Sequence, residues 1–340
     1  MSQRTVLVTG GAGFIGSNFV PWYLERHPSD KLINLDALTY AGDLKNLSEV
    51  ENHPRYTFIK GDICDRELIE KIFKENQIQA VFHFAAESHV DNSISGPGAF
   101  IQTNVVGTFN VLDVARKTWM NGPFQVKPEY ALARFHHVST DEVYGTLGET
   151  GAFTETTPYA PNSPYSASKA SSDMIVRSYF HTYGMNVVTT NCSNNYGPKQ
   201  HNEKLIPTIL RKALSHEPIP IYGNGTNVRD WLYVLDHCEG IDLVFQKGQS
   251  GETYNVGGRN EWQNIRIVEK ICDILDEKRP LSNGSYRQFM TFVQDRPGHD
   301  KRYAIDATRL ENELGWRAEE TFATGIVKTV DWYLKKFENQ

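Results

Sequence analysis

The chain has 340 residues, of which 39% are hydrophobic and 22% charged, and its formal net charge is −6 at pH 7. This length allows a large buried core and suits a nucleotide-binding fold with an added substrate lobe. The acidic balance argues against a nucleic-acid binder, which must neutralise phosphates. The chain has no apolar run of about 18 residues and no targeting segment before Val6, so we expect no membrane insertion and a cytoplasmic location.

A strand, a glycine turn and a helix open the chain in that order. The β-branched run Thr5–Thr9 predicts a strand, the segment Gly10–Gly16 contains four glycines, and a helical stretch continues to about His27. Glycines allow a tight turn and a close approach of the backbone, and the N-terminus of a helix favours a pyrophosphate. The order therefore predicts a dinucleotide site.

An acidic residue follows the second expected strand. Lys31–Leu35 reads as a strand that ends in Asp36, about 20 residues beyond the last glycine, where a carboxylate binds a ribose diol. The same charge repels a 2′-phosphate, so the pattern predicts NAD rather than NADP. The alternative is a glycine-rich turn followed by a surface aspartate, and the combined spacing disfavours it.

The third expected strand, Tyr56–Lys60, leads into Asp62 and Ile63. Two interpretations of Asp62 stay open. Its carboxylate can accept a hydrogen bond from an adenine amine while Ile63 packs on the ring, or it can cap the helix that starts near Asp65.

The fourth expected strand, Ala80–Phe84, ends in the small residues Ala85 and Ala86, which let the backbone approach a nicotinamide ribose. The histidines within strands, His83, His136 and His137, read as core residues with hydrogen-bond partners. The four cysteines are far apart and read as reduced structural thiols. No group of side chains has the spacing of metal ligands, so we expect no metal.

A long helix is expected over Gly98–Thr118. The loop Lys117–Arg134 that follows is unusually long, and it is either a surface excursion or part of an oligomer edge. A buried-looking strand, Asn186–Thr190, comes later and precedes a polar run that ends at Pro198.

Polar groups suited to acid–base chemistry follow the strand expected over Arg134–Val138. Thr140, Asp141 and Glu142 lie where that strand ends, and ligands bind outside the carboxyl ends of strands in open α/β sheets. Tyr165 and Lys169 share a helix face. A cation beside a phenol favours the phenolate, which can then act as a base. A polar strand end followed by a surface helix is the alternative, and the glycine motif favours catalysis over it.

Alternating strands and helices predict an α/β fold, with a Rossmann-type doubly wound parallel sheet and a smaller α/β C-terminal substrate lobe. The pattern changes after Pro198, so we assign residues 1–198 to the NAD-binding domain and 199–340 to the substrate lobe, with the chain free to cross between the two. Basic and aromatic residues in this lobe suit an anionic ligand that carries a ring, because the arginine fork binds a diphosphate bidentately.

Taken together, these motifs resemble the extended short-chain dehydrogenase/reductase family. The glycine motif, Asp36, the Ala85–Ser88 turn and the Tyr165–Lys169 pair carry the resemblance. Within this family the dTDP-glucose 4,6-dehydratases are the most similar group, by the segments Ser139–Gly145, Asn194–Pro198, Lys204–Pro207, Arg229–Trp231 and Asp295–Asp300. The resemblance covers nearly the whole chain. Sugar-nucleotide epimerases share the glycine motif and the Tyr–Lys pair but lack the adjacent Asp–Glu pair.

The resemblance implies a lyase that converts dTDP-glucose to dTDP-4-keto-6-deoxyglucose and water. Tyr165 takes the 4-hydroxyl proton while NAD takes the C4 hydride, Thr140 hydrogen-bonds the same oxygen, and Lys169 lowers the pKa of the tyrosine. Glu142 then removes the C5 proton, Asp141 protonates the departing 6-hydroxyl, and the hydride returns to C6. The sequence does not show which of the two carboxyls has the raised pKa.

The resemblance also implies two sets of contacts. The cofactor set is Gly10, Gly13, Phe14, Ile15, Gly16, Asp36, Ala37, Leu38, Thr39, Asp62, Ile63, Ala85, Ala86, Ser88, Thr103, Tyr165, Lys169 and Asn194. The substrate set is Ser88, Thr140, Asn195, Lys204, Leu205, Pro220, Tyr222, Arg229, Asn264, Arg296 and His299. Arg229 and Arg296 are the candidates for the diphosphate, and Tyr222 with Lys204 and Leu205 for the base pocket.

Relatives in the family commonly form homodimers through a four-helix bundle. The segments Gly98–Thr118 and Ser168–Tyr183 would supply the two helices of each subunit, although their apolar residues also suit an ordinary core.

Three other functions remain open. A UDP-sugar 4-epimerase and a 4,6-dehydratase that acts on another nucleotide sugar are enzymatic alternatives. A redox-sensing regulator that binds NAD without turnover is the third, and loss or burial of Tyr165 or Lys169 would favour it.

Overall fold

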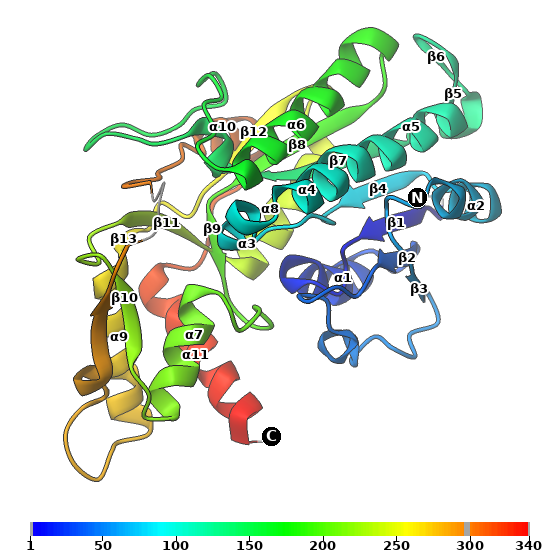
Figure 1. Cartoon of the computed structure of the whole chain (residues 1–340). Helices are drawn as coiled ribbons and strands as arrows, with labels where there is room; N and C mark the ends of the chain where they lie inside the picture. Colours follow the sequence, from blue (N-terminus) through cyan, green and yellow to red (C-terminus); the bar gives the residue numbers. More distant parts are fainter. Residues whose placement is uncertain (1–2, 296–299, 339–340) are drawn as a thin grey trace.

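A seven-stranded parallel sheet forms the centre of the molecule (Figure 1). The structure is a computed structural model that describes residues 3–295 and 300–338. The strand order is β12-β8-β7-β4-β1-β2-β3, and each neighbouring pair is parallel. The strands are β1 (Thr5–Thr9), β2 (Lys31–Asp36), β3 (Tyr56–Lys60), β4 (Ala80–His83), β7 (Arg134–Thr140), β8 (Val187–Cys192) and β12 (Thr253–Val256).

Helices cover both faces of this sheet because its strands carry apolar side chains on both sides. Leu7 packs in the core beneath α2 (Arg66–Asn76), α5 (Thr108–Trp119) and α6 (Pro164–Tyr183). Its neighbours Val6 and Val8 face the opposite core, which α1 (Phe14–Arg26) and α8 (Val234–Lys247) cover. Alternate side chains of a strand point to opposite faces, so near-continuous apolar strands require this doubly wound arrangement. The predicted fold class is confirmed.

The strand boundaries differ from the predicted ones at the edge that matters for the site. β7 continues to Thr140, two residues beyond its predicted end, because β8 pairs with it as far as Thr140 opposite Cys192. β8 likewise ends at Cys192 rather than Thr190. The longer pairing fixes the backbone up to the residue before Asp141.

The prediction of one continuous helix over Gly98–Thr118 is wrong. A short helix, α4 (Pro97–Phe100), leads into a π-helical segment, η2 (Ile101–Gly107), before α5 begins. The side chain of Asn104 on this segment bonds both the turn after β4 and helix α6. Wider π-helical turns are frequent at functional sites, and this one brings an amide between two elements of the site.

A smaller α/β lobe follows the main sheet, as predicted, and it lies to the lower left in Figure 1. One small sheet contains β9 (Asn194–Tyr196), β11 (Val228–Tyr233) and β13 (Glu261–Gln263), and another pairs β10 (Ile219–Tyr222) with β14 (Met290–Val293). Helices α7 (Leu205–Leu214), α9 (Asn264–Lys278) and α11 (Phe322–Glu338) bury their apolar faces in its core.

The chain crosses back to the main sheet within its second half. Helix α8 packs against α1, strand β12 pairs with β8, and α10 (Thr308–Leu314) packs against β12. The smaller lobe is thus formed by residues on both sides of this return, and the boundary at residue 198 stays a prediction. The remaining short elements are η1 (Leu44–Leu47), α3 (Val90–Ser95), β5 (Met120–Gly122), β6 (Gln125–Val126), η3 (Pro128–Tyr130), η4 (Asp141–Tyr144) and η5 (Tyr286–Phe289).

The long loop after α5 is an ordered excursion. It contains the antiparallel pair β5–β6, and the amide of Phe124 donates to the carbonyl of Tyr183 at the end of α6, at 2.7 Å. The Trp119 indole N–H donates to the Ile78 carbonyl at 2.7 Å, so the base of the excursion is fixed to the core.

The strand histidines are core residues, as predicted. Both ring nitrogens of His83 bond threonine hydroxyls, Nδ1 to Thr9 at 2.7 Å and Nε2 to Thr108 at 2.9 Å. Burial lowers the pKa values of all three, including His136 and His137, so they are neutral. All four cysteines are free.

Three helices meet around the buried carboxylate of Asp113 on α5. Its oxygens lie 2.6 Å from Arg66 on α2, 2.9 Å from Arg116 and 3.2 Å from Lys117, and the Tyr179 hydroxyl on α6 donates at 3.3 Å. Burial alone would raise the pKa of Asp113, but the hydrogen bonds from its basic partners outweigh it and lower the pKa to about 2. The carboxylate therefore ties this helical layer together.

Replacing Asp113 with asparagine should destabilise the fold by about 2 kcal/mol near neutral pH, because its partly exposed basic partners lose a buried, charged hydrogen-bond acceptor. The pKa of Asp113 lies below that of an unfolded aspartate, so its stabilisation is present above about pH 4 and is lost as the pH falls toward 2. Urea unfolding of both proteins near pH 7 and pH 3 measures this, and the difference should shrink at the lower pH.

Glu70→Gln is the matched control, since Glu70 is an exposed partner of Arg66 at 2.9 Å. It should cost below about 0.5 kcal/mol. Equal effects of the two substitutions would show that the Asp113 cluster has no special contribution.

Candidate active site

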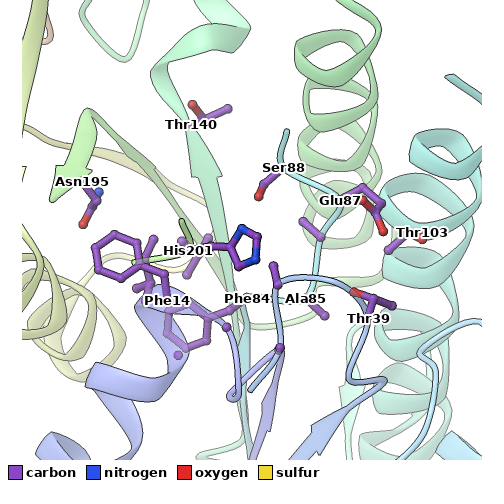
Figure 2. A pocket seen from close by; sticks show the side chains of 18 of the residues that line it. Phe14, Thr39, Phe84, Ala85, Glu87, Ser88, Thr103, Thr140, Asn195 and His201 are labelled. Atoms are coloured by element: carbon purple, nitrogen blue, oxygen red, sulfur yellow. The ribbon is translucent and has the colours of Figure 1, made fainter. Parts of the chain in front are cut away.

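A cavity of about 310 Å³ opens at the carboxyl ends of β1, β4, β7 and β8, facing the smaller lobe (Figure 2). In Figure 2, Ser88, Thr140 and Asn195 lie around it, each contributed by a different segment. The expected residues that line it are Gly10, Gly13, Phe14, Ile15, Gly16, Asp36, Ala37, Thr39, Asp62, Ile63, Ala85, Ala86, Ser88, Thr103, Thr140, Asp141, Glu142, Tyr165, Lys169, Asn194, Asn195 and Lys204. One cavity thus contains the glycine turn, the two carboxyls and the Tyr–Lys pair.

The glycine turn has the geometry of a phosphate cradle. Gly10 has φ +73°, and a Cβ added there would lie 2.6 Å from the backbone nitrogen of Ala85. A Cβ on Gly16 would lie 2.3 Å from the Gly10 carbonyl oxygen. Helix α1 begins after Gly13 with no side-chain cap, so the first N–H groups of the helix are open to an anionic group. These features fit a dinucleotide pyrophosphate.

The two acidic residues expected near the cofactor differ in how they are held. Asp36 accepts hydrogen bonds from the backbone N–H of Ala12 and Leu38, both at 2.8 Å. Burial raises the pKa of Asp36, while these two hydrogen bonds lower it. Asp62 lines the cavity, and the α2 helix is capped instead by Asp65, whose carboxylate accepts from the Leu68 amide at 3.0 Å. The capping interpretation of Asp62 is therefore wrong.

The carboxyl of Asp141 is buried where it lines the cavity, at the end of β7. The residue is 1% exposed, its Oδ1 accepts a hydrogen bond from the Thr140 hydroxyl at 3.4 Å, and its Oδ2 has no partner among the described residues. Burial raises the pKa of Asp141 well above its ordinary value, and the charge of Glu142 adds to this. Burial therefore favours the protonated form of Asp141, a feature that the sequence could not show.

Tyr165 and Lys169 lie on the first turns of α6, which starts after a capping box at Ser163. Burial raises the pKa of Tyr165, the charge of Glu142 adds to it, and a hydrogen bond with Thr140 opposes it. The direction is opposite to the lowering expected from Lys169, because the removal of the phenol from water dominates. The Lys169 ammonium is itself buried and donates to the Val138 carbonyl at 2.9 Å.

Asp173, one turn further along α6, supports the buried Lys169. Its Oδ1 lies 3.0 Å from His137 Nε2, and its Oδ2 accepts from the hydroxyls of Ser139 at 2.8 Å and Tyr159 at 3.0 Å. Burial lowers the pKa of Lys169, and the charge of Asp173 raises it. Sequence reasoning missed Asp173, although its spacing of four residues from Lys169 was a usable signal.

Asn104 joins the turn after β4 to helix α6 and was also missed. Its amide nitrogen donates to the Glu87 carbonyl at 3.0 Å and to the Ser168 hydroxyl at 2.9 Å. Its amide oxygen accepts from the Glu87 backbone N–H at 2.8 Å. This side chain fixes the backbone that borders the cavity relative to Tyr165 and Lys169.

A strap between β9 and α7 closes one side of the cavity. Lys199 donates to the Ser17 carbonyl on α1 at 3.0 Å, and Lys204 donates to the Ser88 carbonyl at 3.0 Å. Several lining residues were not expected from the sequence because irregular segments supply most of them: Glu87, Cys192, Ser193, Gln200, His201 and Glu203.

Part of the expected substrate set lies away from this cavity. Arg229 is buried, donates to the carbonyls of Val228 at 2.7 Å and Asp300 at 2.8 Å, and stacks on the Tyr303 ring at 4.3 Å. Its guanidinium therefore supports the backbone of this lobe. The other expected residues outside the lining are Leu38, Leu205, Pro220, Tyr222 and Asn264. Arg296 and His299 lie outside the described residues.

Two absences concern the described ranges 3–295 and 300–338. Within them no helix is long and apolar enough to span a membrane. In the same ranges no cluster of three His, Cys, Asp or Glu side chains could hold a metal ion.

Comparisons with known proteins agree with this geometry. Residues 7–329 match the family described as GDP-mannose 4,6 dehydratase. A dTDP-glucose 4,6-dehydratase of Xanthomonas campestris is 59% identical over 98% of this chain and 93% of its own.

Among solved structures, a dTDP-glucose 4,6-dehydratase is more similar to this chain in sequence than a UDP-glucose 4-epimerase is. A dTDP-glucose 4,6-dehydratase of Bacillus anthracis in complex with NAD has a TM-score of 0.86 at 47% identity, with 98% of each chain covered. A UDP-glucose 4-epimerase of Thermotoga maritima has a TM-score of 0.85 at 27% identity, covering 98% of this chain and 100% of its own. The chain therefore belongs to the sugar-nucleotide 4,6-dehydratase family of the extended short-chain dehydrogenases/reductases, within which the dTDP-glucose 4,6-dehydratases are its close relatives.

Proposed function

We propose that this protein binds NAD and converts dTDP-glucose to dTDP-4-keto-6-deoxyglucose and water. The observation that carries the proposal is the pair Asp141 and Glu142 at the end of β7, in the cavity that contains the glycine turn and Tyr165, with the pKa of Asp141 raised by burial. Elimination of water needs a proton donor and a base, and this pair supplies both. NAD-bound and closely similar dehydratases support the cofactor and the substrate.

The side chains then have distinct tasks. Tyr165, hydrogen-bonded to Thr140, takes the proton of the 4-hydroxyl. Bound NAD supplies hydride chemistry, with C4 as donor and C6 as final acceptor. The C4 ketone acidifies C5, so Glu142 can remove the C5 proton while Asp141 protonates the departing 6-hydroxyl. Lys169 places a positive charge on the face of α6 that carries Tyr165.

The cofactor contacts are proposed from the residues that line the cavity. The backbone of the glycine turn and the N-terminus of α1 would hold the pyrophosphate. Asp36 would bind a ribose diol through the lone pairs that its two backbone hydrogen bonds leave free. Ala85, Ala86 and Thr103 border the remaining part of the cavity.

The competing functions fit the site less well. An epimerase has no task for Asp141 and Glu142, yet the cavity contains both. Burial of Tyr165 or Lys169 would favour a regulator without turnover, and both residues are largely shielded from solvent. Both nevertheless line the cavity, so the shielding reflects a deep site rather than separation from a ligand. A dehydratase for another nucleotide sugar would use the same chemistry, and the first assay below separates it.

We also propose that the protein is a homodimer located in the cytoplasm. Apolar side chains on the outer surface of the helical layer support the four-helix pairing: Ile101 on η2, Phe109 on α5 and Met174 on α6 are each 40–50% exposed. A surface of this kind on adjacent helices suits a second copy of the chain.

The reaction itself gives the first prediction. With dTDP-glucose and NAD, the protein should yield a product lighter by one water, measured by mass spectrometry. Asp141→Asn and Glu142→Gln should each lower kcat by roughly 100-fold or more, because general acid and base catalysis contribute that much. Glu155→Gln is the control, since this carboxylate is not among the residues that line the cavity.

Product of unchanged mass with an altered C4 configuration would instead establish an epimerase. Turnover of UDP- or GDP-sugars but not dTDP-glucose would leave the chemistry standing and remove the base-pocket assignment.

The pH profile gives a second prediction. Elimination requires protonated Asp141, whose pKa is raised by burial, so the single-turnover rate of water loss should fall as the pH rises through that pKa. Rapid-quench measurement of product over a pH series tests this. Asp141→Asn should remove the alkaline limb from the residual rate, and a limb that persists in this variant would belong to another group.

The oligomer gives a third prediction. Met174→Glu and Phe109→Glu should each shift the protein from dimer toward monomer, because a charge would be buried in the helix pairing. Size-exclusion chromatography with light scattering measures the mass. Leu132→Glu, at an 83% exposed position in the excursion after α5, is the control and should leave the dimer intact. A wild-type protein with the mass of one chain would contradict the homodimer.

A further inference from the structure

After each turnover of the proposed reaction, two residues have protonation states that differ from those at the start. The C5 proton goes to Glu142 and returns to C5, and the hydride leaves C4 and ends on C6. The 4-hydroxyl proton, however, ends on Tyr165, while Asp141 has given its own proton to the departing water. Before the next turnover, Tyr165 must lose a proton and Asp141 must gain one. This balance rests on the proposed function.

A single hydroxyl lies between these two groups. Tyr165 is hydrogen-bonded to Thr140, and Thr140 Oγ1 in turn donates to Asp141 Oδ1 at 3.4 Å. The backbone N–H of Glu142 donates to the same Oγ1 at 3.3 Å and orients it. A threonine hydroxyl can accept one proton while it donates another, which is what a relay requires.

Bulk solvent has poor access to the three groups. Asp141, Thr140 and Tyr165 are all buried, at the end of β7 and the first turn of α6. Within the described residues, the only protein hydrogen bond to the Asp141 carboxyl comes from Thr140, and Oδ2 has no partner. A proton that reaches Asp141 through the protein therefore passes through the Thr140 hydroxyl.

We propose that Thr140 is a proton relay that resets the enzyme between turnovers. The O–H bond of Tyr165 breaks as Thr140 Oγ1 accepts the proton, and the original Thr140 proton forms a new O–H bond on Asp141 Oδ1. The step regenerates the phenolate and the neutral carboxyl, with no electron transfer and no net charge change.

Pre-steady-state kinetics of Thr140 variants test the relay. Thr140→Val keeps the size of the side chain but lacks the hydroxyl, Thr140→Ala lacks it in a smaller form, and Thr140→Ser keeps it. With excess dTDP-glucose in rapid-quench experiments, the wild type and Thr140→Ser should form product linearly. Both hydroxyl-free variants should show a burst of one product per site, followed by a phase slower by 10-fold or more.

The burst is expected because the first turnover starts from enzyme whose protons have equilibrated with solvent, so only later turnovers wait for that slow exchange. Small buffer acids should accelerate the slow phase in Thr140→Val. A readout independent of rate is the infrared C=O band of a protonated carboxyl, which should disappear during the burst and recover with the slow phase. The band should be absent in an Asp141→Asn control.

Other outcomes would distinguish failure of the relay from failure of the proposed function. Equal slowing of the first and later turnovers in Thr140→Val and Thr140→Ala, with no burst, would overturn the relay and leave Thr140 as a hydrogen-bond donor to the C4 oxygen. No product from the wild type would overturn the proposed function itself. Bound NAD content and thermal midpoints of the variants, compared with the wild type, check that each one is folded.

Discussion

The contact between the end of β7 and the start of α6 holds Thr140, Tyr165 and Lys169 in place around the cavity. The Lys169 ammonium donates to the Val138 carbonyl, and the Ser139 hydroxyl donates to Asp173. Together these two bonds join the last residues of the strand to the first turns of the helix. Because β7 also pairs with β8 up to Thr140, the backbone is fixed until the residue before Asp141. A small shift here would separate the phenol from the carboxyls.

Three ionisable groups that line the cavity are buried, and burial determines the direction of their pKa shifts. Asp141, Tyr165 and Lys169 are each removed from water, and in each case burial disfavours the charged form. Neighbouring groups oppose the effect of burial in part: the charge of Asp173 at Lys169, and the hydroxyl of Thr140 at Asp141 and Tyr165. Buried groups exchange protons with neighbouring groups more readily than with solvent. A site of this kind suits chemistry that moves a proton and a hydride without loss to solvent.

The smaller lobe and the main domain are built by repeated crossings of one chain. After β9 and α7 have entered the lobe, α8 and β12 return to the sheet, and α11 enters the lobe again. The strap that carries Lys199 and Lys204 bonds to α1 and to the turn after β4. The cavity is thereby enclosed by segments that lie far apart in the sequence, and its shape depends on how the two parts of the fold meet.

The sequence by itself determined the parallel sheet, the glycine turn and the positions of Thr140, Asp141, Glu142, Tyr165 and Lys169. Local signals suffice for these features, because β-branched runs, glycine spacing and residues four apart on a helix are physical properties of short segments. Only the fold showed that the carboxyl of Asp141 is buried and its pKa raised, because burial and the proximity of other charges set a pKa. It likewise decided that η2 is π-helical, that Asn104 bonds two distant elements, and that Arg229 supports backbone carbonyls. Those features depend on partners 17 to 71 residues away along the chain, and no local pattern encodes such distances.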